Sequence, residues 1–370
     1  MKRLAFIVNS LGIGGAEKHT ITLANSLSKM NYEITLFVLK NNCDLKEEVN
    51  KNIKIEFMEV NRFYDINTIK KIREICKIRE IKQVFCVNSY PLLYGYNATK
   101  QTDIRCILIH HTTQLVGLKD KIKNIYFKRL MNKCDYRIFV SSNQRDYWFN
   151  KYNIKVNGSY VIRNGVNVNK FLAENDLKKL IELKDKLNIS EDDLVIVCSA
   201  MFREEKNHIK LLEYINFSIK QNIKNIKLLL LGDGQKREEI ESYIKTNGLE
   251  KFVLILGKQK DVREFYNISD IGILPSKAVE TFSIAALEQM SMGIPMIMSN
   301  IGGANEMVID GFNGYLYNLK DDSVVVNIIN ELANNKVKIN KMGINAQNLI
   351  RSNFTEEKMI KNYINFIESI

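Results

Sequence analysis

The chain has 370 residues, of which 45% are hydrophobic and 26% charged, and its formal net charge is +12. This composition is typical of a soluble globular protein, the length suggests two domains of about 150–200 residues each, and no apolar run approaches the ~18 residues of a membrane span. The charge favours an anionic partner such as a nucleic acid, an anionic bilayer or a phosphorylated ligand, unless it reflects only the lysine-rich composition that an AT-rich genome produces.

Six cysteines are scattered along the sequence without a CxxC pair or a Cys/His cluster. This pattern argues for reduced thiols, and against a zinc site or a disulfide framework. The first apolar run, 4–8, is shorter than the roughly 7–15 residues that a signal peptide needs. We therefore expect a cytoplasmic protein.

The first half of the chain alternates strand-like and helix-like segments. The apolar run 3–10 is followed by the Gly-rich turn LGIGGAE and an amphipathic segment, which predicts a strand, a tight loop and a helix. Further strands are expected at 32–40, 81–90, 105–113 and 136–142, and helices at 67–80 and 119–133.

The same pattern restarts near residue 194. Strands are expected at 194–202, 226–234, 252–258, 271–276, 294–299 and 314–317, helices at 206–221, 235–247, 261–268 and 281–292, and a last amphipathic helix at 355–370. Alternation of this kind predicts parallel sheets with helices on both faces. The fold class is therefore α/β, with two doubly wound domains in tandem whose ligands lie beyond the carboxyl ends of the strands.

The segment 276–295 combines an apolar helical pattern with two acids, Glu280 and Glu288. A carboxylate that is buried without a partner costs several kcal/mol, so each acid needs a donor. The backbone amides of 281–283, in the first turn of the expected helix, would form an anion site. Alternatively, Glu280 caps the helix and Glu288 pairs with a Lys or Arg.

Two cations, Arg203 and Lys206, follow the first strand of the second half. They could hold a diphosphate, Arg203 by bidentate hydrogen bonds and Lys206 as a point charge, or they could be surface charges. Glycines at 302–314 would permit close approach of the backbone to a ligand, or make turns.

Taken in order, these motifs resemble the retaining GT-B-fold glycosyltransferases of family 4, also called glycosyl transferases group 1. The resemblance rests on Glu280 and Glu288 separated by seven residues and followed by GIPMIMSNIGGANEMVIDGFNG, and on GGAEKHTITLANSL, VIRNGVN, EEKNH and LLGDGQKREEIE. It covers nearly the whole chain. It implies two Rossmann-like domains facing across a deep cleft: an acceptor-binding domain 1–168, a nucleotide-sugar-binding domain 169–353, and a C-terminal helix 354–370 that packs back on the first domain.

The resemblance also implies roles for individual residues. Arg203 and Lys206 would stabilise the charge on the leaving nucleoside diphosphate, although many members place the Arg at the position of Met201. Glu288 would bind the donor ribose, and Glu280 and His111 would lie near the transferring sugar. Other donor contacts are expected from Gly14, Gly15, Gly257, Lys258 and the amides of Thr281, Phe282 and Ser283. Second-tier or acceptor contacts are expected from Glu17, His110 and Asn164; either histidine could instead be a polar loop residue, and Glu17 a first-turn helix acid.

The reaction implied by the resemblance is retaining transfer of a hexose or N-acetylhexosamine from a nucleoside-diphosphate sugar to a hydroxyl of a saccharide acceptor. Uridine diphosphate (UDP) is the usual donor nucleotide of the family, and bacterial cell-surface polysaccharide or lipid-linked oligosaccharide synthesis is the expected setting. No Asp-x-Asp triplet occurs in the chain. We therefore expect transfer that needs neither a metal nor a cofactor.

The segment 117–134, GLKDKIKNIYFKRLMNKC, mixes basic, aliphatic and aromatic residues. Such a segment can rest on an anionic bilayer, which predicts peripheral contact with the inner face of the cell membrane. The alternative is a helix packed on its own sheet with a solvated basic face.

Three rival functions are weaker. An NAD-linked enzyme would need glycine where Glu17 stands, because a carboxylate repels a pyrophosphate. A nucleic-acid-binding protein would fit the charge, but no motif of that class is present. A GT-B-fold epimerase or phosphorylase stays an alternative within the same fold.

Overall fold

The structure, a computed structural model, describes residues 2–112, 118–173, 176–278 and 280–370. The chain divides into an N-terminal unit, residues 1–164 with 359–370, and a C-terminal unit, residues 165–358, and each is described by itself. The junctions lie a few residues from the expected 168 and 353. The chain passes from one unit to the other twice, in two crossing segments near residues 165 and 358. A parallel β-bridge between Val166 and Thr355, both in the C-terminal unit, joins these two segments.

Close backbone contact at this bridge explains the glycine of the NGV motif. A Cβ atom on Gly165 would lie 2.3 Å from the carbonyl oxygen of Thr355. The amide of Val166 donates to the carbonyl of Phe354 at 2.9 Å, and the amide of Glu356 donates to Val166 at 2.9 Å. Any side chain at position 165 would therefore push the two crossing segments apart.

The described strands of the N-terminal unit form one parallel sheet of seven, in the order β3-β2-β1-β4-β5-β6-β7. The order reverses between β1 and β4, which makes the unit doubly wound, as the sequence predicted. Two short strands at the sheet edges, β3 and β7, were not predicted. The bounds are β1 (Arg3–Val8), β2 (Glu33–Val38), β3 (Lys54–Phe57), β4 (Gln83–Val87), β5 (Arg105–His110), β6 (Tyr136–Phe139) and β7 (Ser159–Val161).

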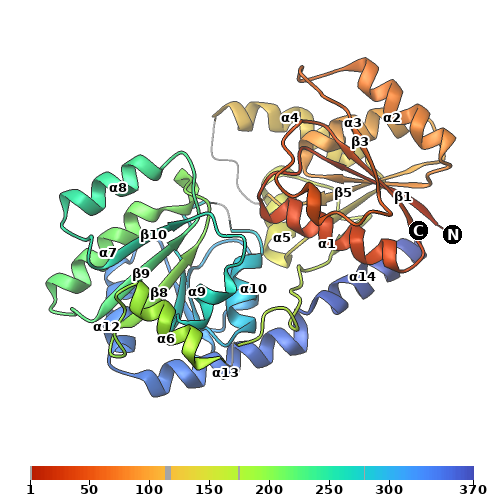
Figure 1. Ribbon diagram of the computed structural model, residues 1–370. Coiled ribbons are helices and arrows are strands. Elements are labelled where there is room, and N and C mark those ends of the chain that lie inside the picture. The colour runs from red at the N-terminus through yellow and green to blue at the C-terminus, as the bar shows by residue number, and fades with distance from the viewer. Residues whose placement is uncertain (1, 113–117, 174–175, 279) are drawn as a thin grey trace. The chain divides into compact units, whose positions relative to one another are not determined.

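Helices cover both faces of this sheet (Figure 1). Alternate residues of β1 serve two cores: Leu4, Phe6 and Val8 pack on one face, Ala5 and Ile7 on the other, as the two-residue period of a strand requires. The helices are α1 (Gly15–Lys29), α2 (Ile66–Ile78), α3 (Ser89–Thr99), α4 (Leu118–Lys133), α5 (Ser142–Tyr152) and α14 (Glu356–Ser369).

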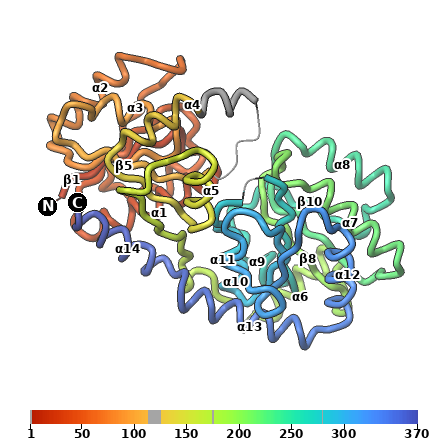
Figure 2. Tube along the Cα trace, turned by 180° about the vertical axis from the view of Figure 1, so that it is seen from behind, coloured from red at the N-terminus to blue at the C-terminus, as the bar shows by residue number. Residues whose placement is uncertain are grey.

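The C-terminal helix α14 packs on the N-terminal sheet, which confirms the predicted return of the chain. Tyr363 and Phe366 are buried in the same core as Phe6 and Phe85. The side-chain amide of Gln83 donates to the carbonyl of Ile367 at 3.1 Å. Figures 1 and 2 show the two chain ends close together, where Lys2 and Glu368 form an ion pair at 2.8 Å.

The described strands of the C-terminal unit form a second parallel sheet, in the order β10-β9-β8-β11-β12-β13. Here the order reverses between β8 and β11. The strands are β8 (Leu194–Ser199), β9 (Ile226–Leu231), β10 (Val253–Gly257), β11 (Ile271–Leu274), β12 (Met296–Ser299) and β13 (Gly314–Tyr317). The helices are α6 (Leu177–Lys186), α7 (His208–Lys220), α8 (Arg237–Thr246), α9 (Arg263–Asn267), α10 (Ile284–Ser291), α11 (Ala304–Met307), α12 (Asp322–Ala333) and α13 (Lys336–Asn353).

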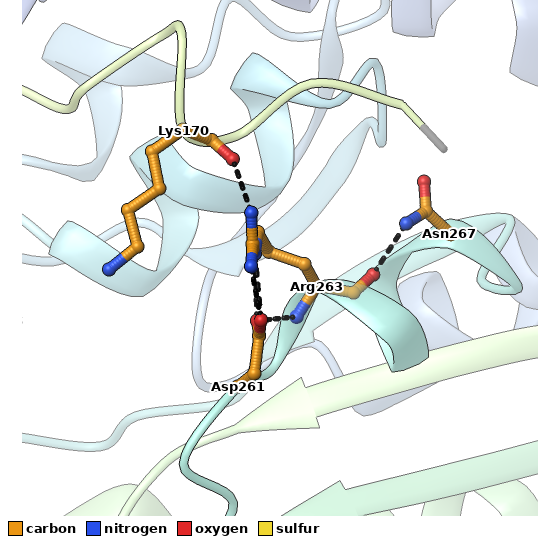
Figure 3. A network of polar contacts seen from close by, with 4 residues as sticks. All are labelled: Lys170, Asp261, Arg263 and Asn267. Carbon is orange, nitrogen blue, oxygen red and sulfur yellow. Dashed lines mark hydrogen bonds and ion pairs between the residues drawn. The ribbon is translucent and has the colours of Figure 1, made fainter. Parts of the chain in front are cut away.

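Polar contacts hold the entry segment of the C-terminal unit against α9 (Figure 3). The Arg263 guanidinium donates to both oxygens of Asp261, with Nε at 2.8 and 3.0 Å, and to the carbonyl of Lys170 at 3.3 Å. Hydrogen bonding to Arg263 lowers the pKa of Asp261 to about 2. The pair with Asp261 orients the Arg263 guanidinium, and its hydrogen bond to the Lys170 carbonyl holds the entry segment against α9.

The described part of α4 covers its own sheet. Leu130 and Met131 are buried in the core beside Phe139, whereas Ile125 and Tyr126 are 64% and 43% exposed. This agrees with the packed-helix alternative for Leu130 and Met131. The rest of the predicted membrane segment 117–134, residue 117 and the side chains of 118–124, lies outside the described residues. In the part of the chain that the structure describes, no helix is both long and apolar enough to span a bilayer.

Candidate active site

The central feature of the C-terminal unit is a buried ion pair at the point where the strand order reverses. Lys206 follows β8 and Glu280 follows β11, and these strands are neighbours. Lys206 Nζ lies 2.8 Å from Glu280 Oε2, and the two side chains are 22% and 6% exposed. The Ser276 hydroxyl donates to the same carboxylate oxygen at 2.8 Å. Carboxyl ends of strands at such a switch point are where open α/β sheets bind ligands.

Backbone contacts fix the two loops that carry this pair. The amide of Lys277 donates to the carbonyl of Glu205 at 2.9 Å, and the Asn207 side chain donates to the carbonyl of Pro275 at 3.2 Å. Sequence reasoning identified Lys206 and Glu280 separately, but not the bonds that join their loops. The pair is therefore preorganised by contacts next to it on both sides.

A third loop, after β12, closes against Glu280. Gly302 has φ +56°, and a Cβ atom there would lie 1.8 Å from the Glu280 carbonyl oxygen. The next amide, of Gly303, donates to that carbonyl at 3.2 Å. Only glycine permits both the left-handed backbone and this approach. The Gly302–Gly303 pair noted in the sequence thus supports the site through backbone packing.

Arg203 lies at the rim of the same loop, exposed to solvent. It precedes the single 3₁₀ turn Glu204–Lys206, and its carbonyl accepts from the Lys206 amide at 3.0 Å. Among the residues that the structure describes, its guanidinium makes no ion pair. Next to it, Lys236 and Lys277 both pair with Glu204 and lower the pKa of that carboxyl to about 2. Sequence reasoning missed these three charges.

The helix after Glu280 begins later than predicted. α10 starts at Ile284, and Ser283 is its N-cap, with its hydroxyl accepting from the Ala286 amide at 3.3 Å. Placing the amides of 281–283 in the first turn was therefore wrong, because they precede the helix. The alternative that Glu280 caps the helix is also wrong, since the serine takes that place.

Within α10, Glu288 is buried at 8% exposure among apolar neighbours, as the sequence predicted. Burial raises the pKa of the Tyr266 hydroxyl on α9, and the negative charge of Glu288 raises it further. Helix α13 packs along α10 (Figure 2), where the Gln347 side chain donates to the Ser291 carbonyl at 3.1 Å. Glu288 is thus held on a rigid element.

Gly257 and Lys258 lie apart from this pair. Gly257 is the last residue of the edge strand β10, which is separated from β8 by β9, and its φ is +71°. The next residue, Lys258, is exposed. The structure therefore brings Lys206 and Glu280 together at the ends of the neighbouring strands β8 and β11, but it does not bring Gly257 and Lys258 to them. A role beside the base stays a prediction.

In the N-terminal unit, Gly14 and Gly15 lie at the start of α1, after β1. Gly14 is the N-cap, and a Cβ atom there would lie 2.3 Å from a carboxylate oxygen of Glu17. Glu17 occupies the third helical position, so its acid lies close to the positive end of the helix. It also lines a cavity of about 610 Å³.

The two adjacent histidines at the end of β5 have different surroundings. His110 is buried, lines the cavity and lies with its ring 4.5 Å from that of Trp148. His111 has its ring 4.7 Å from that of His19, and its amide donates to the Asn88 side chain at 2.8 Å. Burial lowers the pKa of His110 to about 3 and that of His111 to about 4, so both are neutral at neutral pH.

Asn164 ends the first of the two segments that make up the N-terminal unit, and it is buried. The roles expected for it, for His110 and for His111 stay predictions. No group of three or more His, Cys, Asp or Glu side chains placed to hold a metal ion occurs among the described residues.

Two family models match the chain, one for each half. The model described as Glycosyltransferase Family 4 matches residues 13–170, and the model described as Glycosyl transferases group 1 matches residues 180–349. The chain belongs to the family 4 glycosyltransferases. It is accordingly a GT-B-type glycosyltransferase that acts on a nucleotide sugar and a saccharide acceptor.

Individual relatives agree with this assignment. The chain is 27% identical over 279 residues to an Escherichia coli UDP-Gal:alpha-D-GlcNAc-diphosphoundecaprenol alpha-1,3-galactosyltransferase, covering 72% of this chain and 70% of that protein. It is 30% identical over 186 residues to a Bacillus anthracis N-acetyl-alpha-D-glucosaminyl L-malate synthase. That second match covers 50% of this chain and 48% of the relative.

The fold of the glycosyltransferase matches solved structures over its whole length. Anabaena HepE, crystallised with UDP and glucose, superposes with a TM-score of 0.88 at 19% identity, covering 100% of both chains. The GT-B fold expected from the sequence is therefore confirmed.

Proposed function

We propose that this glycosyltransferase moves a hexose or N-acetylhexosamine from a UDP-sugar to a hydroxyl of a saccharide acceptor, with retention of anomeric configuration and without a metal. The observation that carries the proposal is the Lys206–Glu280 pair, preorganised at the carboxyl ends of β8 and β11. A cation held here by a buried acid can stabilise charge that develops on a leaving diphosphate. Arg203, exposed on the same loop, would add a second cation.

The remaining roles follow from chemistry and position. The Glu280 carboxylate orients the Lys206 ammonium and can accept from hydroxyls of the transferring sugar. Glu288 can accept from both hydroxyls of the donor ribose, and Thr281 to Ser283 can offer amides to the diphosphate from the loop before α10. We assign no covalent nucleophile. We place the enzyme in the cytoplasm, at the inner face of the cell membrane, in cell-surface polysaccharide or lipid-linked oligosaccharide synthesis.

A thermal-shift panel of nucleotide sugars, with and without EDTA, tests the donor and the metal. A ligand that binds only the folded protein stabilises it by RT ln(1 + [L]/Kd), about 2.7 kcal/mol at one hundred times Kd. We expect a UDP-sugar to raise the melting temperature equally in both conditions. A shift abolished by EDTA would contradict metal independence. Nucleotide release without any acceptor would favour an epimerase, and formation of a sugar phosphate from a saccharide and inorganic phosphate would favour a phosphorylase.

Replacing Glu288 by Ala tests the ribose contact. Because a diol hydrogen-bonded to a carboxylate contributes about 1.5–3 kcal/mol, we expect the Kd for UDP to rise by roughly 10- to 100-fold. Isothermal titration calorimetry with UDP, and with uracil as a ligand without ribose, provides the measurement. Glu331→Ala, which removes a surface acid on α12, is the control. Unchanged UDP affinity in folded Glu288→Ala protein would refute the assignment.

A further inference from the structure

A histidine lies in the apolar core of the N-terminal unit. His19 on α1 is 2% exposed and falls in one stripe of the helix with Leu23 and Leu27, at steps of four residues. Among the residues that the structure describes, neither of its ring nitrogens has a hydrogen-bond partner. Buried polar atoms without a partner lower stability, so a leucine here would suit the fold better. The fold alone therefore does not account for this histidine.

Three aromatic rings meet at this position, one from each of three elements of the same unit. The ring of His19 lies 4.7 Å from that of His111, which follows β5, at an interplanar angle of 65°. The ring of Tyr363 on α14 lies 5.5 Å from that of His19, at 57°. Tyr363 is fully buried, and within the described ranges its hydroxyl has no hydrogen-bond partner either. His19 thus meets these two neighbours by ring packing, and contacts between aromatic rings are directional.

The backbone around His111 is held separately, by side chains of other elements. The His111 amide donates to the Asn88 side chain at 2.8 Å, and Asn88 has φ +71°, which residues other than glycine seldom adopt. The Gln144 side chain on α5 donates to the carbonyls of His110 at 2.7 Å and of Thr112 at 3.0 Å. Both polar atoms of the peptide group before His111 are therefore bonded, and the side-chain torsions of His111 remain to be set.

The orientation of the His111 ring has a chemical consequence. Burial lowers the pKa of His111 to about 4, so its ring is neutral at neutral pH. Burial also lowers the pKa of His19 well below its usual range, and the neighbouring His111 lowers it further. A neutral imidazole donates from one nitrogen and accepts at the other, so its action depends on which nitrogen faces a reacting group. The ring of His19 packs directly against the ring whose orientation matters.

We propose that His19 is a positioning residue of the transfer reaction: its ring holds the imidazole of His111 in one orientation, and Tyr363 on α14 holds the ring of His19. The flat ring makes the contact, and a five-membered ring fills less space in a close-packed core than a phenyl ring does. The inference rests on the proposed function, because it takes His111 to act on the transferring sugar.

Two variants of His19 test the role of the ring. His19→Leu removes the flat ring, and we expect kcat to fall by about 10- to 100-fold, as when a reacting group is misplaced by about 1 Å, with an unchanged Kd for UDP. Because the variant also removes two buried polar atoms without partners, its melting temperature should equal or exceed that of the wild type. His19→Phe keeps a flat ring, and its kcat should stay within about threefold of the wild type.

Steady-state kinetics, calorimetry with UDP and thermal unfolding make these measurements. A wild-type kcat in His19→Leu would overturn the proposal, and so would a kcat in His19→Phe as low as that of His19→Leu. Thr20→Val is the matched control, since it removes a buried polar group next to His19 on the same helix. The Thr20 hydroxyl donates to the Ala16 carbonyl at 2.7 Å, and we expect its loss to leave kcat unchanged. The same fall in kcat in Thr20→Val would contradict a specific role of His19.

A double-mutant cycle tests whether His19 acts through His111. If it does, His19→Leu lowers kcat in the wild-type background and has no further effect in the His111→Ala background, because the ring that it positions is gone. Equal fractional losses of kcat in the two backgrounds would show that His19 acts in another way, and would refute the proposal.

Nuclear magnetic resonance separates this inference from the proposed function, because it needs no substrate. The chain has four histidines, so ¹³C-labelled histidine gives four ring signals, and His19→Leu and His111→Ala assign two of them by their loss. We expect His19→Leu to shift the His111 signal, since a neighbouring aromatic ring is lost, and to leave the signal of His208 in the C-terminal unit in place. An unshifted His111 signal would overturn the inference.

The two kinds of failure have different outcomes. If His19→Leu shifts the His111 signal but UDP-sugars support no turnover, the proposed donor is wrong and the ring contact stands. If UDP-sugars support turnover and His111→Ala keeps the wild-type kcat, the positioning role of His19 is refuted and the transferase activity stands.

Discussion

Replacing Lys206 by Ala is expected to lower kcat by about 10²- to 10³-fold, the usual effect of removing one group that stabilises transition-state charge. The substitution also leaves the Glu280 carboxylate, which is 6% exposed, with the Ser276 hydroxyl as its one remaining side-chain donor among the described residues. Breaking a fully buried pair costs about 3–5 kcal/mol, and the partial exposure of Lys206 reduces this to about 2–3 kcal/mol. Steady-state kinetics and chemical denaturation measure the two effects.

The double variant Lys206→Ala/Glu280→Gln separates chemistry from folding. Glutamine at position 280 removes the uncompensated negative charge and has nearly the size of glutamate. We therefore expect most of the free energy of unfolding to return while kcat stays low. Lys277→Ala is the matched control, since it breaks a neighbouring ion pair that is exposed, and should cost less than about 1 kcal/mol. Full recovery of turnover in the double variant would mean that the pair is only structural.

Replacing Gly302 by Ala is expected to impair the site indirectly, by displacing the backbone of Glu280. The new methyl group would lie 1.8 Å from the Glu280 carbonyl, at a backbone φ of +56° that disfavours any side chain. The left-handed backbone costs about 1–2 kcal/mol and the clash about 1–3 kcal/mol more. Since the backbone contact cannot persist, Glu280 must move relative to Lys206. We expect UDP-sugar turnover to fall at least tenfold.

Gly311 supplies the control for this prediction. Its φ is +72°, but a Cβ atom there has nothing within 4 Å. Gly311→Ala should therefore lose only the backbone contribution, about 1–2 kcal/mol, and keep its turnover. Thermal unfolding and steady-state kinetics of both variants make the comparison. Equal losses in the two would show that close approach to Glu280 is unimportant.

Much of the fold could be predicted from local sequence. Apolar runs of four to six residues between helical segments define the parallel strands, because a strand buried on both faces reads as a continuous apolar stretch. The edge strand β3 does not follow this rule and was therefore not predicted. Its sequence, KIEF, alternates charged and apolar residues and is only partly buried. The unpredicted helix α3, by contrast, is buried nearly all round and begins after Asn88 without a side-chain cap, so neither amphipathic period nor capping marks it.

The sequence by itself determined the α/β class, the order of most strands and helices, and the family through the order of its motifs and the spacing of Glu280 and Glu288. These features depend on periodicity and on residue spacing, which are local. Only the tertiary structure decided that Lys206 and Glu280 form one buried pair, since their contact spans strands that are neighbours in space and distant in sequence. It also decided that His110, and not its neighbour His111, lines the cavity, because consecutive side chains at a strand end point in different directions. The contacts of the Phe63 ring with those of Tyr90 and Phe127 could not be foreseen either, because the three residues come from the loop after β3 and from helices α3 and α4, which are distant in sequence.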